Sequence, residues 1–118
     1  MAAGNTIKNV IRGDTRQINC TLNANGNPVD ITGWTAFFTV NANNDPITDA
    51  GAVIEKETTT HINPTEGETG FTLENSDTQN LVPGVYFYDI QFKDTDGNIT
   101  SIPQAEFIVV ADITRRIS

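Results

Sequence analysis

The sequence predicts a single all-β domain, and three observations lead to this prediction. Short runs of alternating apolar and polar residues recur along the chain, as they do in half-buried strands. Gly, Asn, Asp and Pro residues separate these runs, which is typical of turns between strands. The 3.6-residue apolar period of an amphipathic helix is absent. The length of 118 residues suits one domain spanning residues 1–118.

The alternating runs define about seven candidate strands, a number that favours an immunoglobulin-like sandwich of antiparallel strands. The single cysteine, Cys20, has no partner for a disulfide within the chain, so the expected sandwich is disulfide-free. We expect the folded core to span about residues 6–111 and residues 112–118 to form an extended tail. The expected strands are Thr6–Arg12, Arg16–Asn23, Trp34–Asn41, Ala52–Ile62, Gly70–Glu74, Val85–Lys93 and Asn98–Val110, the last of them broken at Pro103.

Alternation within three of these strands assigns the core. Cys20 and Trp34 take the positions of the first cysteine and the core tryptophan of an antibody-type domain, and Tyr88 takes the place of the second cysteine. Tyr86 follows the turn Leu81–Gly84 and matches a tyrosine corner, whose hydroxyl bonds to upstream backbone. The expected inward residues are Ile18, Cys20, Leu22, Trp34, Ala36, Phe38, Val40, Tyr86, Tyr88, Ile90 and Phe92.

The charge of the chain excludes two classes of partner. Seven basic residues against fifteen acidic ones give a net charge of -8, which repels both nucleic-acid backbones and anionic membrane surfaces. No apolar run approaches the roughly 20 residues of a membrane span, and the first residues lack the apolar stretch of a signal peptide. We therefore expect a soluble protein without nucleic-acid or membrane partners.

Polar segments between the strands are where a binding site is expected. Asn41–Gly51 and Asn63–Thr69 read as loops, and Asn25–Pro28 and Asp94–Asn98 as turns that need left-handed backbone. Asp94, Asp96 and Asn98 in this segment carry side-chain oxygens at alternate positions. This spacing, with Gly97, resembles the first part of a calcium-binding loop. The twelfth position, where that pattern needs a glutamate, is Ala105, so a turn is favoured over a metal site.

Three further short motifs carry little weight. Arg12-Gly13-Asp14 matches an integrin-binding tripeptide, but Gly13 and Asp14 are expected to form a bend between two strands. Asn19–Thr21 and Asn98–Thr100 match glycosylation acceptors in a chain that begins without a secretory signal. We expect these matches to be fortuitous.

The sequence contains no constellation that points to catalysis. Cys20 alternates with apolar neighbours as a core residue does, and the only histidine, His61, lies far from it in a polar stretch. Glycine-rich phosphate loops, clusters of His or Cys ligands and nucleophile elbows are all missing from the sequence. We expect no enzyme activity and no catalytic, cofactor-binding or metal-binding residues.

A series of short segments extends over about residues 11–116. They are Gly13–Thr15, Gly26–Trp34, Asp77–Thr78, Leu81–Ile90 and Asp112–Arg115. In that order and spacing they resemble the amino-terminal immunoglobulin-like domain of phage baseplate upper proteins and related tail-fibre modules. The resemblance implies an adaptor that docks a longer protein onto the phage tail. The sequence departs from that plan because it ends at Ser118 without the helical linker and distal domain, so it resembles either a shortened piece or a stand-alone virion protein.

Together these observations favour a non-enzymatic structural protein of the virion. Its expected partners are other tail, baseplate or capsid proteins, and a homo-oligomer is left open. The adjacent Arg115 and Arg116 are candidate contacts in such an assembly, because arginine pairs well with carboxylates. The alternative is a carbohydrate- or host-surface-binding module of a phage fibre or bacterial adhesin. Aromatic residues that point away from the core would favour it, and Phe37 and Phe87 are the candidates.

Overall fold

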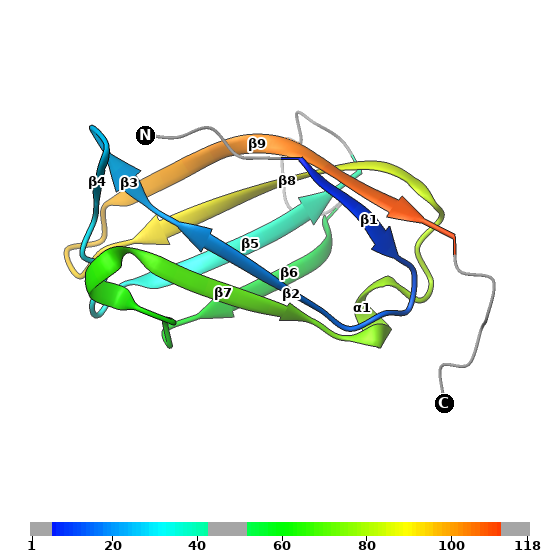
Figure 1. The fold of residues 1–118 in the computed structure, drawn as a ribbon, viewed down its shortest axis with the longest axis horizontal. Helices are drawn as coiled ribbons and strands as arrows, with labels where there is room; N and C mark the ends of the chain where they lie inside the picture. The colour runs from blue at the N-terminus through cyan, green and yellow to red at the C-terminus, as the bar shows by residue number, and fades with distance from the viewer. Residues whose placement is uncertain (1–5, 43–51, 112–118) are drawn as a thin grey trace.

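The computed structural model describes residues 6–42 and 52–111, which fold as a sandwich of two β-sheets. A five-stranded sheet has the order β1-β9-β8-β5-β6, and the strands β2 and β7 form a second sheet that crosses in front of it (Figure 1). A short hairpin, β3-β4, extends from one end. The strands are β1 (Ile7–Ile11), β2 (Arg16–Thr21), β3 (Asn23–Ala24), β4 (Asn27–Pro28), β5 (Thr35–Asn41), β6 (Ala52–Thr58), β7 (Glu68–Leu73), β8 (Gly84–Lys93) and β9 (Ile99–Val110). This arrangement confirms the predicted disulfide-free sandwich.

The edge strand β1 departs from the antiparallel pattern. β6, β5, β8 and β9 are joined by antiparallel pairing, whereas β1 runs parallel to β9, with Val10 beside Val109 and Ile11 beside Val110. The cause is the route of the chain, which turns at Arg12 and Gly13 and crosses to β2 in the other sheet. Strands β1 and β2 therefore do not form the hairpin that their closeness in sequence favours.

The core lies between the two sheets and is centred on aromatic rings. Phe38 is fully buried, and its ring centroid lies 5.4 Å from that of Phe71 in the small sheet and 5.5 Å from that of Tyr88. Because burial of such side chains is the main favourable contribution to folding, this cluster holds the two sheets together. The buried apolar residues are Val10, Ile18, Leu22, Ile31, Ala36, Phe38, Val40, Ile54, Phe71, Leu73, Tyr88, Ile90, Phe92, Ile102, Phe107 and Val109.

Most of the predicted inward residues are buried, but Trp34 is not the central tryptophan that we expected. It lies one residue before β5 and is only partly buried at the margin of the core. Phe38 occupies the central place instead. Cys20 and Tyr86 are also only partly buried. The tyrosine corner is confirmed, because the Tyr86 hydroxyl donates a 2.7 Å hydrogen bond to the carbonyl of Val82.

The predicted break at Pro103 is a β-bulge inside one continuous strand. Pairing runs from Tyr88 opposite Ala105 to Ile90 opposite Ile102, so Pro103 and Gln104 together oppose a single residue of β8. Proline lacks the amide that a regular ladder needs, and a bulge accommodates it without ending the strand. β9 therefore spans all of Ile99–Val110.

Two short helices lie in stretches that alternation did not predict. A 3-10 turn, η2 (Pro64–Glu66), occupies the predicted loop Asn63–Thr69, and β7 begins earlier than expected, at Glu68. A single turn, α1 (Asn75–Thr78), follows β7 and is closed by a capping box between Glu74 and Asp77. The predicted strand Ala52–Ile62 ends at Thr58.

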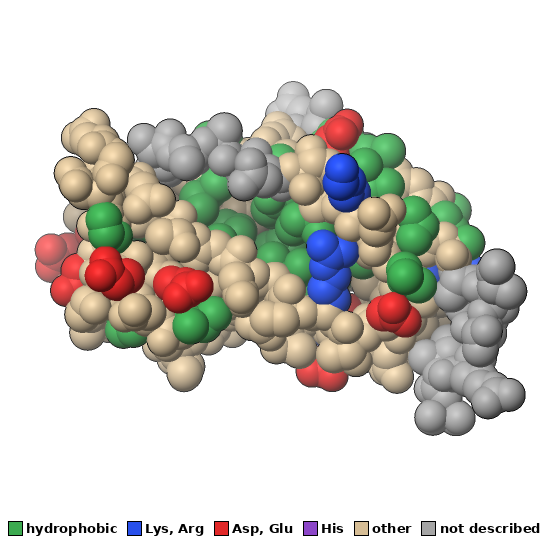
Figure 2. All heavy atoms as spheres, in the orientation of Figure 1, with side chains coloured by type: hydrophobic (Ala, Val, Ile, Leu, Met, Phe, Trp, Pro, Cys, Tyr) green, Lys and Arg blue, Asp and Glu red, His purple; other side chains and the backbone are tan. Residues whose placement is uncertain are grey.

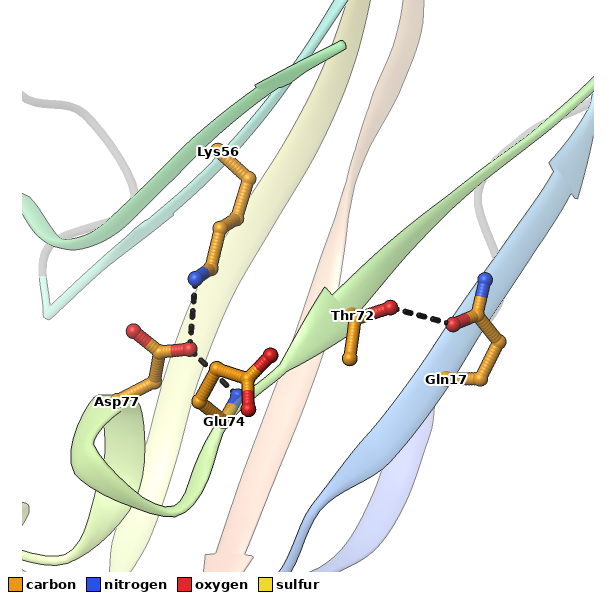
Figure 3. A network of polar contacts seen from close by, with 5 residues as sticks. All are labelled: Gln17, Lys56, Thr72, Glu74 and Asp77. Atoms are coloured by element: carbon orange, nitrogen blue, oxygen red, sulfur yellow. Dashed lines mark hydrogen bonds and ion pairs between the residues drawn. The ribbon is translucent and has the colours of Figure 1, made fainter. Parts of the chain in front are cut away.

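Asp77 also links the two sheets through α1 (Figure 3). Its Oδ2 accepts a 2.7 Å hydrogen bond from the backbone amide of Glu74 and lies 2.7 Å from Nζ of Lys56 on β6. On β7, the Thr72 hydroxyl donates a 2.7 Å hydrogen bond to Gln17 on β2. These contacts fix the end of β7 relative to β2 in its own sheet and to β6 in the other sheet.

Candidate interaction surface

The segment Asp94–Asn98 is a tight turn whose carboxylate is used by the turn itself. Oδ1 of Asp94 accepts hydrogen bonds of 2.9 Å from the backbone amides of Asp96 and Asn98, and Gly97 adopts a φ of 90°. These hydrogen bonds, that from Asn98 first, hold the pKa of Asp94 below its usual value of 3.8. The predicted turn is confirmed. Within residues 6–42 and 52–111, no group of three or more His, Cys, Asp or Glu side chains is arranged to hold a metal ion.

The Arg12-Gly13-Asp14 tripeptide forms the predicted bend. Gly13 has a φ of 88°, and its amide donates a 2.8 Å hydrogen bond to the hydroxyl of Thr78 in α1. The amide of Asp14 donates to the carbonyl of Ile11, which closes the turn. The tripeptide is thus tied to α1 rather than presented on a projecting loop.

Cys20 and His61 lie closer than their sequence separation suggests, because both neighbour the buried Thr69. Thr69 pairs with Cys20 across β2 and β7, and its hydroxyl lies 2.9 Å from Nδ1 of His61. Nε2 of His61 lies 2.8 Å from the carbonyl oxygen of Trp34. A carbonyl only accepts, so Nε2 donates and, in a neutral ring, Nδ1 accepts from Thr69.

This arrangement does not activate the thiol. Burial raises the pKa of Cys20 to about 12, which keeps the sulfur protonated and a poor nucleophile near neutral pH. Both ring nitrogens of His61 are engaged by Thr69 and the Trp34 carbonyl. Cys20 and His61 therefore read as structural residues that close one end of the sandwich.

The two outward faces of the sandwich differ in chemistry. On the small sheet, the outward side chains are mainly neutral and bond to one another, as Gln17 does to Asn19 and Thr72. Figure 2 shows this side of the molecule, where acidic and basic side chains are few and scattered.

The outward face of the five-stranded sheet combines apolar and acidic side chains. Because β5 and β8 alternate, the outward positions of Phe37 and Phe87 are confirmed, and both rings are half-buried. Phe37 pairs with Gln91 while Phe87 pairs with Asn41, so the row formed by Thr39 and Asp89 separates the two rings. The rings thus do not form one continuous aromatic platform of the kind on which sugars stack.

We name this surface the outer face and define it by the outward residues of the five strands. Sequence alternation identified two of its members, Phe37 on β5 and Phe87 on β8. It did not identify the neighbours that β1 and β9 contribute, because these depend on the parallel pairing of β1 with β9. The outer face comprises Lys8, Ile11, Thr35, Phe37, Thr39, Val53, Glu55, Glu57, Val85, Phe87, Asp89, Gln91, Lys93, Ile99, Ser101, Glu106, Ile108 and Val110.

Two regions that the sequence singled out lie outside the described residues. Arg115 and Arg116 belong to residues 112–118, and most of the predicted loop Asn41–Gly51 falls within residues 43–51. The exceptions are Asn41, which is the last residue of β5 and is buried, and Ala42, which is an exposed bend. No helix within the described part of the chain has the length and hydrophobicity needed to cross a membrane.

The comparisons with known proteins agree with the fold. The solved structure described as the N-terminal domain of phage TP901-1 ORF48 is similar with a TM-score of 0.58 and 15% sequence identity, covering 85% of this chain and 80% of that chain. No curated protein sequence matched the chain. The profile of the BppU N-terminal domain matches residues 3–117. The chain belongs to this family of phage baseplate upper protein domains and is a structural component of a phage virion.

Proposed function

We propose that this chain is a non-enzymatic adaptor, which joins other proteins of a phage tail or baseplate through contacts of its folded surface. The observation that carries this proposal is the family match over residues 3–117, nearly the whole chain. Function resides in sites carried on a fold, and a domain of this family can act through the surface that its sandwich presents.

The chemistry of the described residues supports the same function. The motifs that offered an alternative activity serve the fold: Asp94 closes a turn, Gly13 is bonded to α1, and His61 joins Thr69 to Trp34. The surface of the sandwich is the part of the described structure that could contact other proteins. Such surfaces bind partners through complementary shape and charge.

The direct test is the protein content of purified particles of the phage that encodes this chain. Quantitative mass spectrometry should find the chain at a fixed copy number relative to the major tail proteins. Particles made without it should lack at least one other tail or baseplate protein, since an adaptor holds a neighbour in place. A chain that is absent from particles, or whose removal leaves every other virion protein at its normal level, would refute the adaptor function. Binding on a glycan array would instead support a carbohydrate-binding module.

A further inference from the structure

We propose that the outer face is the docking surface, and that its partner is a virion protein surface that presents Lys and Arg side chains around an apolar centre. This inference rests on the proposed adaptor function and adds to it the face that binds and the chemistry of the partner. Three features of the outer face carry it: an apolar cluster at one end, an acidic remainder, and an edge that disfavours strand addition.

The apolar cluster is built by three neighbouring strands. Ile11 lies beside Val110, Ile108 is the next outward residue on β9, and Val85 pairs with Ile108. Ile11 is 41% exposed and Val85 is 51% exposed, while Ile108 and Val110 are half-buried. Four branched aliphatic side chains therefore adjoin one another, two of them exposed and two half-buried. Isolated exposed apolar residues are ordinary, but contiguous patches mark interaction sites.

Beyond this cluster the outer face is acidic. Glu55 and Glu57 are exposed on β6, Asp89 lies on β8, and Glu106 is exposed beside Phe87. Basic residues are fewer on the described strands of this sheet: Lys93 pairs with Ile99 at the opposite end from the cluster, and Lys8 is exposed on the edge strand β1. A partner with Lys and Arg around an apolar centre would match both regions.

The same charges disfavour a second copy of this chain as the occupant. Two outer faces in contact would bring carboxylates against carboxylates, and like charges placed together at an interface are costly. The chain as a whole carries a net charge of -8, which adds to the repulsion between copies.

The edge of the sheet at β6 is poorly suited to binding a further strand, which favours the face over this edge. The edge strand β6 carries three consecutive charged residues, Glu55, Lys56 and Glu57. Charged side chains on an edge strand oppose the addition of a further strand. The centre of the outer face lies on strands β5, β8 and β9, whose side chains are held in a fixed spacing by the ladder.

The test compares matched variants of the full chain in the particles of its phage. Val85→Asp disrupts the apolar cluster, and Ile62→Asp is its control, since Ile62 is 52% exposed and lies against Gly70 on the small sheet. Glu55→Lys reverses a charge on the outer face, and Glu66→Lys makes the same change in η2. Melting temperatures of the four purified variants show whether each is folded.

We expect Val85→Asp and Glu55→Lys each to lower incorporation into particles, by about tenfold for Val85→Asp, which corresponds to about 1.4 kcal/mol of binding free energy. Both controls should be incorporated at the wild-type level. A photo-crosslinking residue placed at position 85 should also join the chain to a virion protein, at a segment that contains Lys or Arg.

The outcomes separate this inference from the proposed function. Normal incorporation of both outer-face variants would overturn the docking surface and leave the adaptor function standing, as would a crosslink from position 85 to a second copy of the chain. Absence of the wild-type chain from particles would overturn both. If Val85→Asp proves unfolded, Glu55→Lys and the crosslink decide the question.

Discussion

Replacement of Gly67 by alanine should be among the most damaging single changes in the chain. Gly67 is buried at the end of η2 and has a φ of 73°. A Cβ atom there would lie 2.6 Å from the carbonyl oxygen of Leu22 and 2.7 Å from that of Val29, below the 3.0 Å that real Cβ atoms respect. Both contacts are backbone atoms, so no side chain can rotate away to relieve them.

The cost of this substitution can be assembled from three contributions. A left-handed backbone costs an alanine about 1–2 kcal/mol. The backbone around Gly67 is tied by 2.9 Å hydrogen bonds from the Leu22 amide to the Gly67 carbonyl and from the Val29 amide to the Leu22 carbonyl. Moving these segments apart weakens at least one such bond, at about 1 kcal/mol, and the overpacking adds roughly 1 kcal/mol or more. We expect Gly67→Ala to lower the free energy of unfolding by about 3–5 kcal/mol.

Gly26 supplies the matched control. Its φ is 80°, close to that of Gly67, but a Cβ atom there would meet nothing within 4 Å. Gly26→Ala should therefore cost only the backbone contribution, about 1–2 kcal/mol. Urea titrations of both variants, followed through the fluorescence of the single tryptophan, Trp34, measure the difference directly. Equal costs for the two substitutions would refute the close approach of backbone at Gly67.

Three further predictions follow from the core and the turns. Phe38→Ala should lower the free energy of unfolding by about 3–5 kcal/mol, and Phe87→Ala should lower it clearly less, because only the Phe38 ring is fully buried. Equal losses in urea titrations would mean that the two faces of β5 and β8 are misassigned. Because the pKa of Asp94 is lowered in the folded state, its carboxylate stabilises the fold above the usual pKa of 3.8, and this contribution is lost as the pH falls below that value. Asp94→Asn keeps an oxygen acceptor for the turn and should show a shallower loss of melting temperature on acidification, and parallel curves would contradict this role. His61→Ala should lower the free energy of unfolding by about 1–3 kcal/mol, because it leaves the buried Thr69 hydroxyl without this partner. An unchanged thermal unfolding curve would show that the hydrogen bonds of His61 are dispensable.

The strands were predictable because each one carries its own signal. Alternation places Ala36, Phe38 and Val40 inward regardless of what lies opposite them, and all three are buried. The tyrosine corner was also predictable, since Tyr86 and the carbonyl of Val82 lie four residues apart in one continuous segment. Features that depend on few consecutive residues can be read from the chain alone.

Features that depend on distant pairing could not be predicted in this way. The place of Phe38 at the centre of the core depends on Phe71, which reaches it from the other sheet. Trp34 lies at the margin of the core, one residue before β5 begins at Thr35. The bulge at Pro103 required the register of β9 against β8, without which a proline indicates only an interruption.

The candidate docking surface combines both kinds of information. By itself, Val85 or Ile108 would be an ordinary outward-facing aliphatic residue. Pairing places them side by side, and the parallel addition of β1 brings Ile11 to Val110 and extends the patch across three strands. The crossing of the chain from β1 to the small sheet thus does more than connect the two layers. It leaves β1 on the large sheet, where its last residue, Ile11, enlarges the apolar cluster. The acidic residues elsewhere on the outer face favour a partner that carries basic side chains.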